Sequence, residues 1–116
     1  MGNVIVLFEA TLKEGGEQAY LQMAAALKEE LSAADGLIEA ERFASLNVPG
    51  RLLSKSEWES EEHVARWRNG IRHRAAQQRG RAELFADYRI TVVSPMRCYT
   101  MDSREEAPED SRMQFD

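Results

Sequence analysis

The chain has 116 residues, 43% of them hydrophobic and 30% charged, which suits one globular domain with a single core. It contains no apolar run of the roughly 20 residues that a membrane-spanning helix needs. Its first residues lack the basic region and cleavage site of a secretory signal. The single cysteine, Cys98, cannot form an internal disulfide. We therefore expect a cytoplasmic protein without membrane association, in which Cys98 is a small apolar strand residue.

The net charge of −5 is unevenly distributed. Residues 101–116 hold six acidic side chains against two arginines and few apolar residues. We therefore predict a folded domain over residues 1–100 and an acidic, disordered tail over residues 101–116. The six arginines between residues 66 and 81 would point in several directions around a helix, so no nucleic-acid partner is expected.

The first half of the chain predicts a strand, a helix and a hairpin. Residues 4–12 are nearly all apolar, which is typical of a strand buried on both faces. Apolar residues recur at helical spacing over residues 17–34, and Gly36 is expected to end this helix in the left-handed conformation. Residues 37–46 and 51–58 predict two strands, joined by the turn sequence Asn-Val-Pro-Gly.

The second half predicts two helices and a last strand. Ser60 is a suitable N-cap for a short helix that breaks at residues 69–70, where Asn and Gly follow each other. A second helix is then predicted as far as residue 88. Residues 89–99 predict the final strand, in which Pro95 indicates an edge position or a bulge.

The element order β-α-β-β-α-β predicts an α+β fold of the ferredoxin-like type with an antiparallel sheet. Helices would cover only one face of this sheet, and the chain has no further element for the other face. Residues such as Phe43 and Leu53 would then be exposed. We therefore predict a symmetric homodimer joined sheet to sheet.

Motifs for several common chemistries are absent from the sequence. The glycines fit neither a dinucleotide-binding nor a phosphate-binding loop, and two histidines ten residues apart do not form a metal motif. What remains is an apolar pocket with a few polar groups, built around Trp67 at the junction of the two predicted helices. Trp67, His63 and His73 are the candidate catalytic residues, because imidazole accepts protons near neutral pH and indole N–H donates to an oxyanion.

Candidate substrate-binding residues flank this group; they are Phe8, Ile71, Arg72, Gln77, Gln78 and Phe85. Each candidate also has a structural interpretation. Trp67 could belong to the core, His63 could lie on an exposed helix surface, and His73 could hydrogen-bond a strand carbonyl. The sequence leaves these alternatives open.

Five short motifs follow one another along the domain: Arg42-Phe-x-Ser-Leu, Pro49-Gly-Arg-x-Leu-Ser, Trp58-x-x-x-Glu, Trp67-Arg and His73-Arg-Ala-Ala-Gln. Over roughly residues 3 to 99 it resembles the antibiotic biosynthesis monooxygenase (ABM) family. The resemblance implies a dimeric α+β barrel with one pocket per subunit between helices and sheet. It also implies oxidation of a small aromatic phenol or quinol by O₂ without flavin, haem or metal, with Trp67 in the pocket and His63 where related enzymes often carry Asn.

Two further functions are weighed against this one. A second branch of the family degrades haem with an Asn on the first strand and an iron-ligating His, and here Phe8 and Gln77 stand at those positions. His73 lies about one helical turn away from the ligand position, so we expect that haem is not the substrate. The other alternative is a non-catalytic dimer that binds a small molecule or a protein partner.

Overall fold

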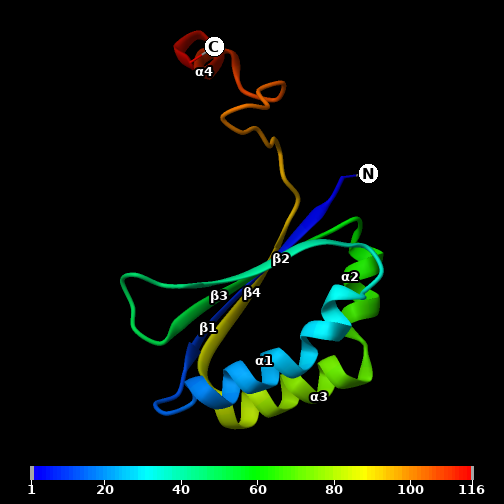
Figure 1. Ribbon diagram of the computed structural model, residues 1–116, viewed down its shortest axis with the longest axis vertical. Coiled ribbons are helices and arrows are strands. Elements are labelled where there is room, and N and C mark those ends of the chain that lie inside the picture. The colour runs from blue at the N-terminus through cyan, green and yellow to red at the C-terminus, as the bar shows by residue number, and fades with distance from the viewer. Residues whose placement is uncertain (1, 116) are drawn as a thin grey trace.

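The computed structural model describes residues 2–115, apart from the side chains of residues 71, 72, 82 and 115. Within this part of the chain, four strands form one antiparallel sheet in the order β2-β3-β1-β4 (Figure 1). The strands are β1 (Val4–Leu12), β2 (Leu37–Ala44), β3 (Arg51–Trp58) and β4 (Phe85–Val93). Because β1 pairs with both β3 and β4, the first strand lies in the middle of the sheet.

Three helices lie on one face of this sheet: α1 (Glu17–Ser32), α2 (Glu61–Arg68) and α3 (Ile71–Arg79) (Figure 1). As predicted, Ser60 caps α2, and its hydroxyl oxygen accepts a hydrogen bond from the backbone N–H of His63 at 3.3 Å. The predicted break follows α2, where the Asn69 side-chain amide donates to the Ala65 carbonyl at 2.8 Å. The arrangement confirms the predicted α+β, ferredoxin-like fold.

The prediction of one helix as far as residue 88 was wrong. Helix α3 ends at Arg79 and continues only as a short π-helical turn, η1 (Gly80–Leu84), before β4 begins at Phe85. The Phe85 ring packs directly over Gly80, where a Cβ atom would collide with it. From Phe85 onward the chain hydrogen-bonds to β1, and this ladder prevails over the helical spacing of the apolar residues.

The last strand also ends earlier than predicted. It stops at Val93, before Pro95, which cannot donate a ladder hydrogen bond. The residues predicted to extend the strand to Tyr99 lie outside the sheet. Cys98 is exposed there, so its prediction as a strand residue was wrong as well.

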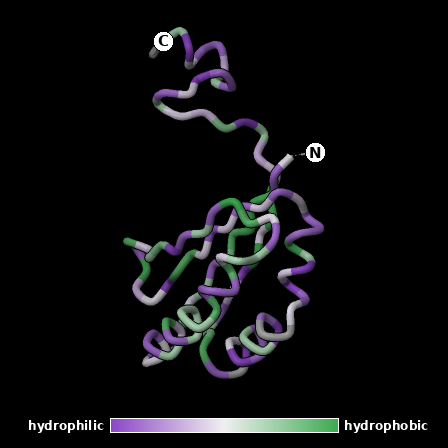
Figure 2. The backbone as a smooth tube through the Cα atoms, turned by 45° about the vertical axis from the view of Figure 1, so that its right-hand side comes forward, coloured by the Kyte–Doolittle hydropathy of each residue, from purple (hydrophilic) through white to green (hydrophobic). Residues whose placement is uncertain are grey.

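The two faces of the sheet differ in their cover. Ala10 and Trp58, which face the helices, are each only 1% exposed. On the opposite face Phe43 is 41% exposed, and its register partner Leu53 is half-buried. Most of β1 is half-buried, and only Ala10 and Leu12 of its helix-side residues are buried, so the prediction of a strand buried on both faces was wrong. Figure 2 shows hydrophobic stretches along the strands, while the helices alternate hydrophobic and hydrophilic residues.

The segment after β4 projects away from the sheet and ends in helix α4 (Glu109–Phe115) (Figure 1). It makes contacts within itself: the Glu106 carboxylate accepts a hydrogen bond from the Cys98 N–H at 2.6 Å, and Ala107 is buried. Disorder of residues 101–116 in solution stays a prediction. Among the described residues, no helix combines the length and the apolar character needed to cross a membrane.

Candidate active site

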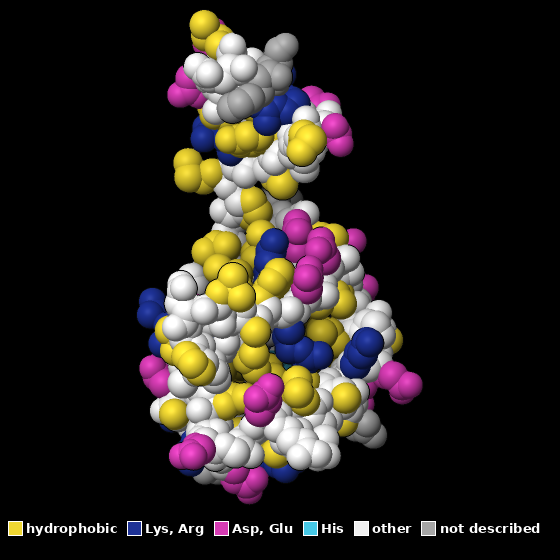
Figure 3. All heavy atoms as spheres, turned by 60° about the vertical axis from the view of Figure 1, so that its left-hand side comes forward, with side chains coloured by type: hydrophobic (Ala, Val, Ile, Leu, Met, Phe, Trp, Pro, Cys, Tyr) yellow, Lys and Arg dark blue, Asp and Glu magenta, His cyan; other side chains and the backbone are white. Residues whose placement is uncertain are grey.

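A cavity of about 570 Å³ lies between the sheet and the helices. Its floor follows from strand alternation, because every second residue of a strand points to the same face. The strand residues that line the floor are Val6, Phe8, Ser54, Ser56, Trp58, Ile90 and Val92. Helix α1 contributes Tyr20, Leu27 and Lys28, among others. Figure 3 shows a hollow on one face of the molecule, where hydrophobic side chains surround Lys and Arg side chains.

Aromatic rings form much of the cavity wall. The rings of Phe8 and Phe85 meet edge to face with centroids 5.5 Å apart, and Tyr20 packs against Phe85 at 6.0 Å. Farther along, the indoles of Trp58 and Trp67 lie 6.2 Å apart. Such a wall suits an apolar or aromatic ligand, since rings attract one another in tilted and edge-to-face arrangements.

The two tryptophans differ in their hydrogen bonding. The indole N–H of Trp58 donates to the Ser56 hydroxyl at 2.9 Å, and Trp58 is almost completely buried. Trp67 is half-buried, and its indole N–H has no hydrogen-bond partner among residues 2–115. Of the two indoles, Trp67 is therefore the one that can donate to a bound molecule.

His73 lies beside Trp67, with ring centroids 5.1 Å apart and planes inclined by 32°. The break between α2 and α3 brings them together, because it lets the chain turn directly after Trp67. The turn is held by the Arg74 guanidinium, which donates to the Asn69 side-chain oxygen at 2.6 Å, and by the Arg74 backbone N–H, which donates to the Gly70 carbonyl at 2.9 Å. The predicted break at Asn69 and Gly70 is thus the turn that places His73 beside Trp67.

The surroundings of His73 favour its neutral form. Burial is the largest cause, and it lowers the pKa of the imidazole below its ordinary value. A hydrogen bond with the Arg68 carbonyl raises the pKa, and the positive charges of Arg74 and Arg68 lower it. His73 Nδ1 lies 3.3 Å from that carbonyl oxygen. A neutral imidazole that donates from Nδ1 keeps its free lone pair on Nε2. His73 is thus arranged as a proton acceptor at neutral pH.

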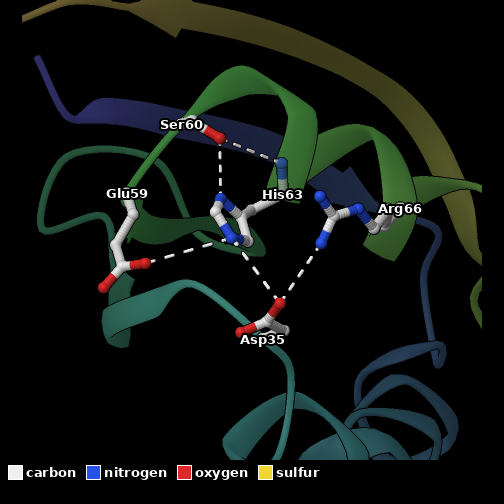
Figure 4. Close-up of polar contacts among 5 residues, drawn as sticks. All are labelled: Asp35, Glu59, Ser60, His63 and Arg66. Carbon is white, nitrogen blue, oxygen red and sulfur yellow. Dashed lines mark hydrogen bonds and ion pairs between the residues drawn. The ribbon is translucent and has the colours of Figure 1, made fainter. Parts of the chain in front are cut away.

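His63 lies on the other side of Trp67, outside the main cavity. It lines a smaller hollow of about 190 Å³ with Ala34, Asp35, Arg66 and Trp67. Figure 4 shows its polar contacts: Nδ1 is 2.7 Å from the Ser60 hydroxyl, and Nε2 is 3.6 Å from Asp35 and 3.9 Å from Glu59. Asp35 also pairs with Arg66 at 3.2 Å.

These contacts connect the α1–β2 turn to α2. Gly36 has a φ of +84°, which confirms its predicted left-handed conformation. The His63 ring occupies the space that a Cβ atom at Gly36 would need. Imidazole and turn therefore fit closely, and His63 holds the outer side of α2 rather than facing the cavity.

The structure places the other sequence-predicted residues as follows. Phe8, Phe85, His73 and Gln77 line the cavity together with Trp67. Gln78 is exposed and is not among the lining residues. The side chains of Ile71 and Arg72 lie outside the described part of the chain, so their roles stay predictions.

Sequence reasoning missed the polar floor on β3 and the β2 edge. Ser54 and Ser56 line the cavity between Leu52 and Trp58, and Arg42 lines it from β2. The alternation Leu52-x-Ser-x-Ser-x-Trp58 contains the signal, because all four residues share one face. In the sequence, this alternation is indistinguishable from that of an ordinary hairpin strand. Within the described residues, no cluster of His, Cys, Asp or Glu is arranged to hold a metal ion.

The fold and the cavity together define a class: small α+β proteins with a ferredoxin-like sheet and a pocket beneath the helices. Solved structures share this fold. Rv0793 from Mycobacterium tuberculosis superposes with a TM-score of 0.76 at 17% identity, covering 84% of this chain and 99% of that one. A conserved protein from Methanosarcina mazei Go1 gives 0.75 at 18% identity, covering 81% and 93%.

The sequence identifies the family. Residues 3–79 match the family model for antibiotic biosynthesis monooxygenase. Jasmonate monooxygenase ABM of Pyricularia oryzae is 39% identical over 87 residues, which are 75% of this chain and 40% of that protein. The chain thus matches less than half of that relative's length. The chain belongs to the antibiotic biosynthesis monooxygenase family.

Proposed function

We propose that the chain is a cofactor-independent monooxygenase that oxidises a small aromatic molecule, a phenol or quinol type of compound, inside the cavity. The substrate itself supplies the electrons: its anion reduces O₂, one oxygen atom enters the product and the other leaves as water. Membership of the family supports the reaction type. The single observation that carries the proposal is the Trp67–His73 pair at the wall of an aromatic cavity.

His73 is the proposed general base. Its lowered pKa keeps it unprotonated at neutral pH, and its contact with the Arg68 carbonyl fixes the ring with Nε2 free. Removal of a substrate proton by Nε2 makes the electron-rich anion that reacts with O₂.

Trp67 is the proposed donor to the substrate anion. Its indole N–H has no other partner among the described residues, whereas that of Trp58 is bonded to Ser56. Among the rings of a largely apolar cavity, a hydrogen bond to a developing oxyanion would be stronger than in solution. In this proposal His73 accepts the substrate proton, and Trp67 stabilises the negative charge of the substrate anion.

The name of the Pyricularia oryzae relative gives jasmonate as its substrate. Monooxygenation of a small organic molecule is therefore the activity that this similarity supports for the present chain. The aromatic preference comes from the cavity wall, where Phe8, Phe85 and the two tryptophans lie.

Oxygen uptake by metal-depleted, flavin-free protein with a panel of phenols, quinols and anthrones tests this function. We expect at least one compound to be consumed with one O₂ per molecule and no accumulation of hydrogen peroxide. Absence of uptake with the whole panel, together with no ligand-dependent quenching of tryptophan fluorescence, would contradict the proposal. A binding or interaction module would then be preferred.

We also propose that the functional unit is a homodimer joined through the sheet face that the helices leave open. The half-exposed Phe43 and its cross-strand partner Leu53 support this assembly, as does the 37% exposure of Val93 on β4, the opposite edge strand. Light scattering at micromolar concentration should give twice the chain mass, and Phe43→Asp should yield monomers, because burying an unpaired carboxylate is costly. A monomeric wild-type protein would overturn the assembly.

A further inference from the structure

The cavity has a second, polar end on strand β2. Arg42 lines the cavity there, directly opposite Ser54 of β3 in the antiparallel register. Lys28 of α1 lines the same cavity from the helix side. A guanidinium, a hydroxyl and an ammonium group thus line the same cavity, and Ser54 lies beside Phe8 in the register, away from the Trp67–His73 pair.

These cations are available to a ligand. Arg42 and Lys28 are exposed, and neither has an ion-pair or hydrogen-bond partner within the described part of the chain. Ser54 is half-buried, and its hydroxyl likewise has no partner there. Some exposed arginines elsewhere are paired, for example Arg66 with Asp35 and Arg79 with Glu83. Arg68, which lines the cavity from α2, is exposed as well.

Two carboxylates lie close by on β2, and the register separates them from the cations. Glu41 pairs with Lys55 and Glu39 with Glu57, positions that alternate with the Arg42–Ser54 pair. Both are therefore on the sheet face away from the helices. Both carboxylates also line the cavity at the exposed edge of β2, so only the face that Arg42 and Ser54 share, and not the whole β2 end, is free of negative charge.

The polar end stands at a defined spacing from the aromatic end. Ser54 is four residues before Trp58 on β3, which is about 13 Å along an extended strand. Trp58 lies against Trp67, and Trp67 against His73. A ligand with its ring at the Trp67–His73 pair would reach Arg42 with a substituent of several atoms.

We propose that the β2 end of the cavity binds an anionic group of the substrate, namely a carboxylate, through Arg42 and Ser54 with support from Lys28. The substrate is then an amphipathic acid, an oxidisable ring that carries a carboxylate on an arm of several atoms. This proposal rests on the proposed monooxygenase function for the reaction at the ring, but the binding itself requires no turnover. Arg42 acts as a specificity determinant, because guanidinium pairs with carboxylate through two parallel hydrogen bonds.

Binding of two matched probes tests the proposal: 4-(1-naphthyl)butanoate, whose arm has several atoms, and its uncharged methyl ester. The chain has two tryptophans, and both line the cavity, so their indole N–H resonances in NMR spectra report occupancy, while calorimetry gives the Kd. We expect the acid to bind at least tenfold more tightly than the ester. Arg42→Gln should weaken the acid by roughly ten- to a hundredfold and leave the ester unchanged, the effect of losing a charge-assisted hydrogen bond.

Control variants separate this effect from general charge. Arg79→Gln removes the same charge from the surface of α3, outside the cavity, and should leave both Kd values unchanged. Ser54→Ala should weaken the acid several-fold without affecting the ester. Equal binding of acid and ester by the wild type, equal weakening of both by Arg42→Gln, or no shift of either indole resonance at millimolar probe would overturn the proposal.

The outcome is distinguishable from a failure of the monooxygenase function. Preference for the acid that depends on Arg42 would support the anion site even if no compound in the oxygen-uptake panel reacted. Once a substrate is known, Arg42→Gln should raise KM and leave kcat within a few-fold, because the anion contact is present before and during the reaction.

Discussion

The two sides of Trp67 offer the clearest comparison in the molecule, because a histidine lies on each. On the cavity side, His73 is half-buried beside arginines, and these surroundings lower its pKa. On the outer side, His63 lies between Asp35 and Glu59 and hydrogen-bonds to the capping Ser60 (Figure 4). A histidine on α2 thus has acidic neighbours, whereas a histidine on α3 has basic ones.

A histidine close to Trp67 in the sequence therefore does not necessarily face the cavity. His63 precedes Trp67 by one helical turn, but the N-cap geometry turns its ring toward the α1–β2 turn. His73 follows a helix break, and the chain reversal there returns its ring to the indole. We therefore assign the proposed proton transfer to His73 and a positioning role to His63.

The largest expected effect separates the two histidines by activity. His73→Ala should reduce turnover by about 10²- to 10⁴-fold, the range for losing a general base. His63→Ala should reduce it by only a few-fold, because that ring does not line the cavity. Single-turnover kinetics on both variants measure the difference. Comparable losses in the two variants would remove the functional distinction between the two sides.

Trp67→Phe tests the wall that divides the two sides. Replacing the indole by a ring without an N–H should cut turnover by roughly ten- to a thousandfold, the scale of losing one oriented donor. The fold should persist, since Phe retains most of the packing, and circular dichroism would verify this. If Trp67 belongs to the core alone, the variant should instead lose stability and keep its activity at low temperature.

Gly36→Ala tests the fit on the outer side, and Gly50→Ala is its matched control. The two glycines have φ values of +84° and +79°, so each substitution introduces left-handed strain of about 1–2 kcal/mol. Only Gly36 also has the His63 ring in the way, whereas nothing lies near Gly50. Urea denaturation should therefore show a greater loss for Gly36→Ala, by about 1 kcal/mol or more. Equal losses would mean that His63 moves aside freely.

The smallest effect is expected for the tail. Truncation after Thr100 removes the acidic segment and should change the melting temperature by no more than a few degrees, because the described contacts of this segment lie mostly within it. Differential scanning calorimetry measures the change. A larger fall would identify the tail as a docked element, exchanged between subunits of the proposed dimer.

Much of the fold was predictable from local signals in the sequence. The hairpin followed from its turn residues, α2 from the Ser60 cap, and the break from Asn69 and Gly70. The end of α3 was not predictable, because the residues near Phe85 have helical spacing. The helix ends because β4 pairs with β1, which is distant in the sequence, and because Phe85 packs over Gly80. Neither contact can be predicted from local sequence patterns.

The candidate site was predictable in part, for a related reason. Trp67, His73 and Phe8 stood out by type and position, and the cavity brings them together. Arg42 and Ser54 did not stand out, since each is an ordinary residue of a hairpin strand. Their shared face becomes informative only when the sheet register and the open space beside β2 are known.

The pH dependence of oxygen uptake, measured on the wild type and on His73→Ala, tests directly whether His73 is the general base. Because the pKa of His73 is lowered, the rate should hold at neutral pH, and its midpoint on the acid side should lie below the ordinary histidine value of about 6.5. His63→Ala should keep this acid limb, and His73→Ala should lose it along with most of the rate. An acid limb that persists in His73→Ala, or disappears in His63→Ala, would contradict the account.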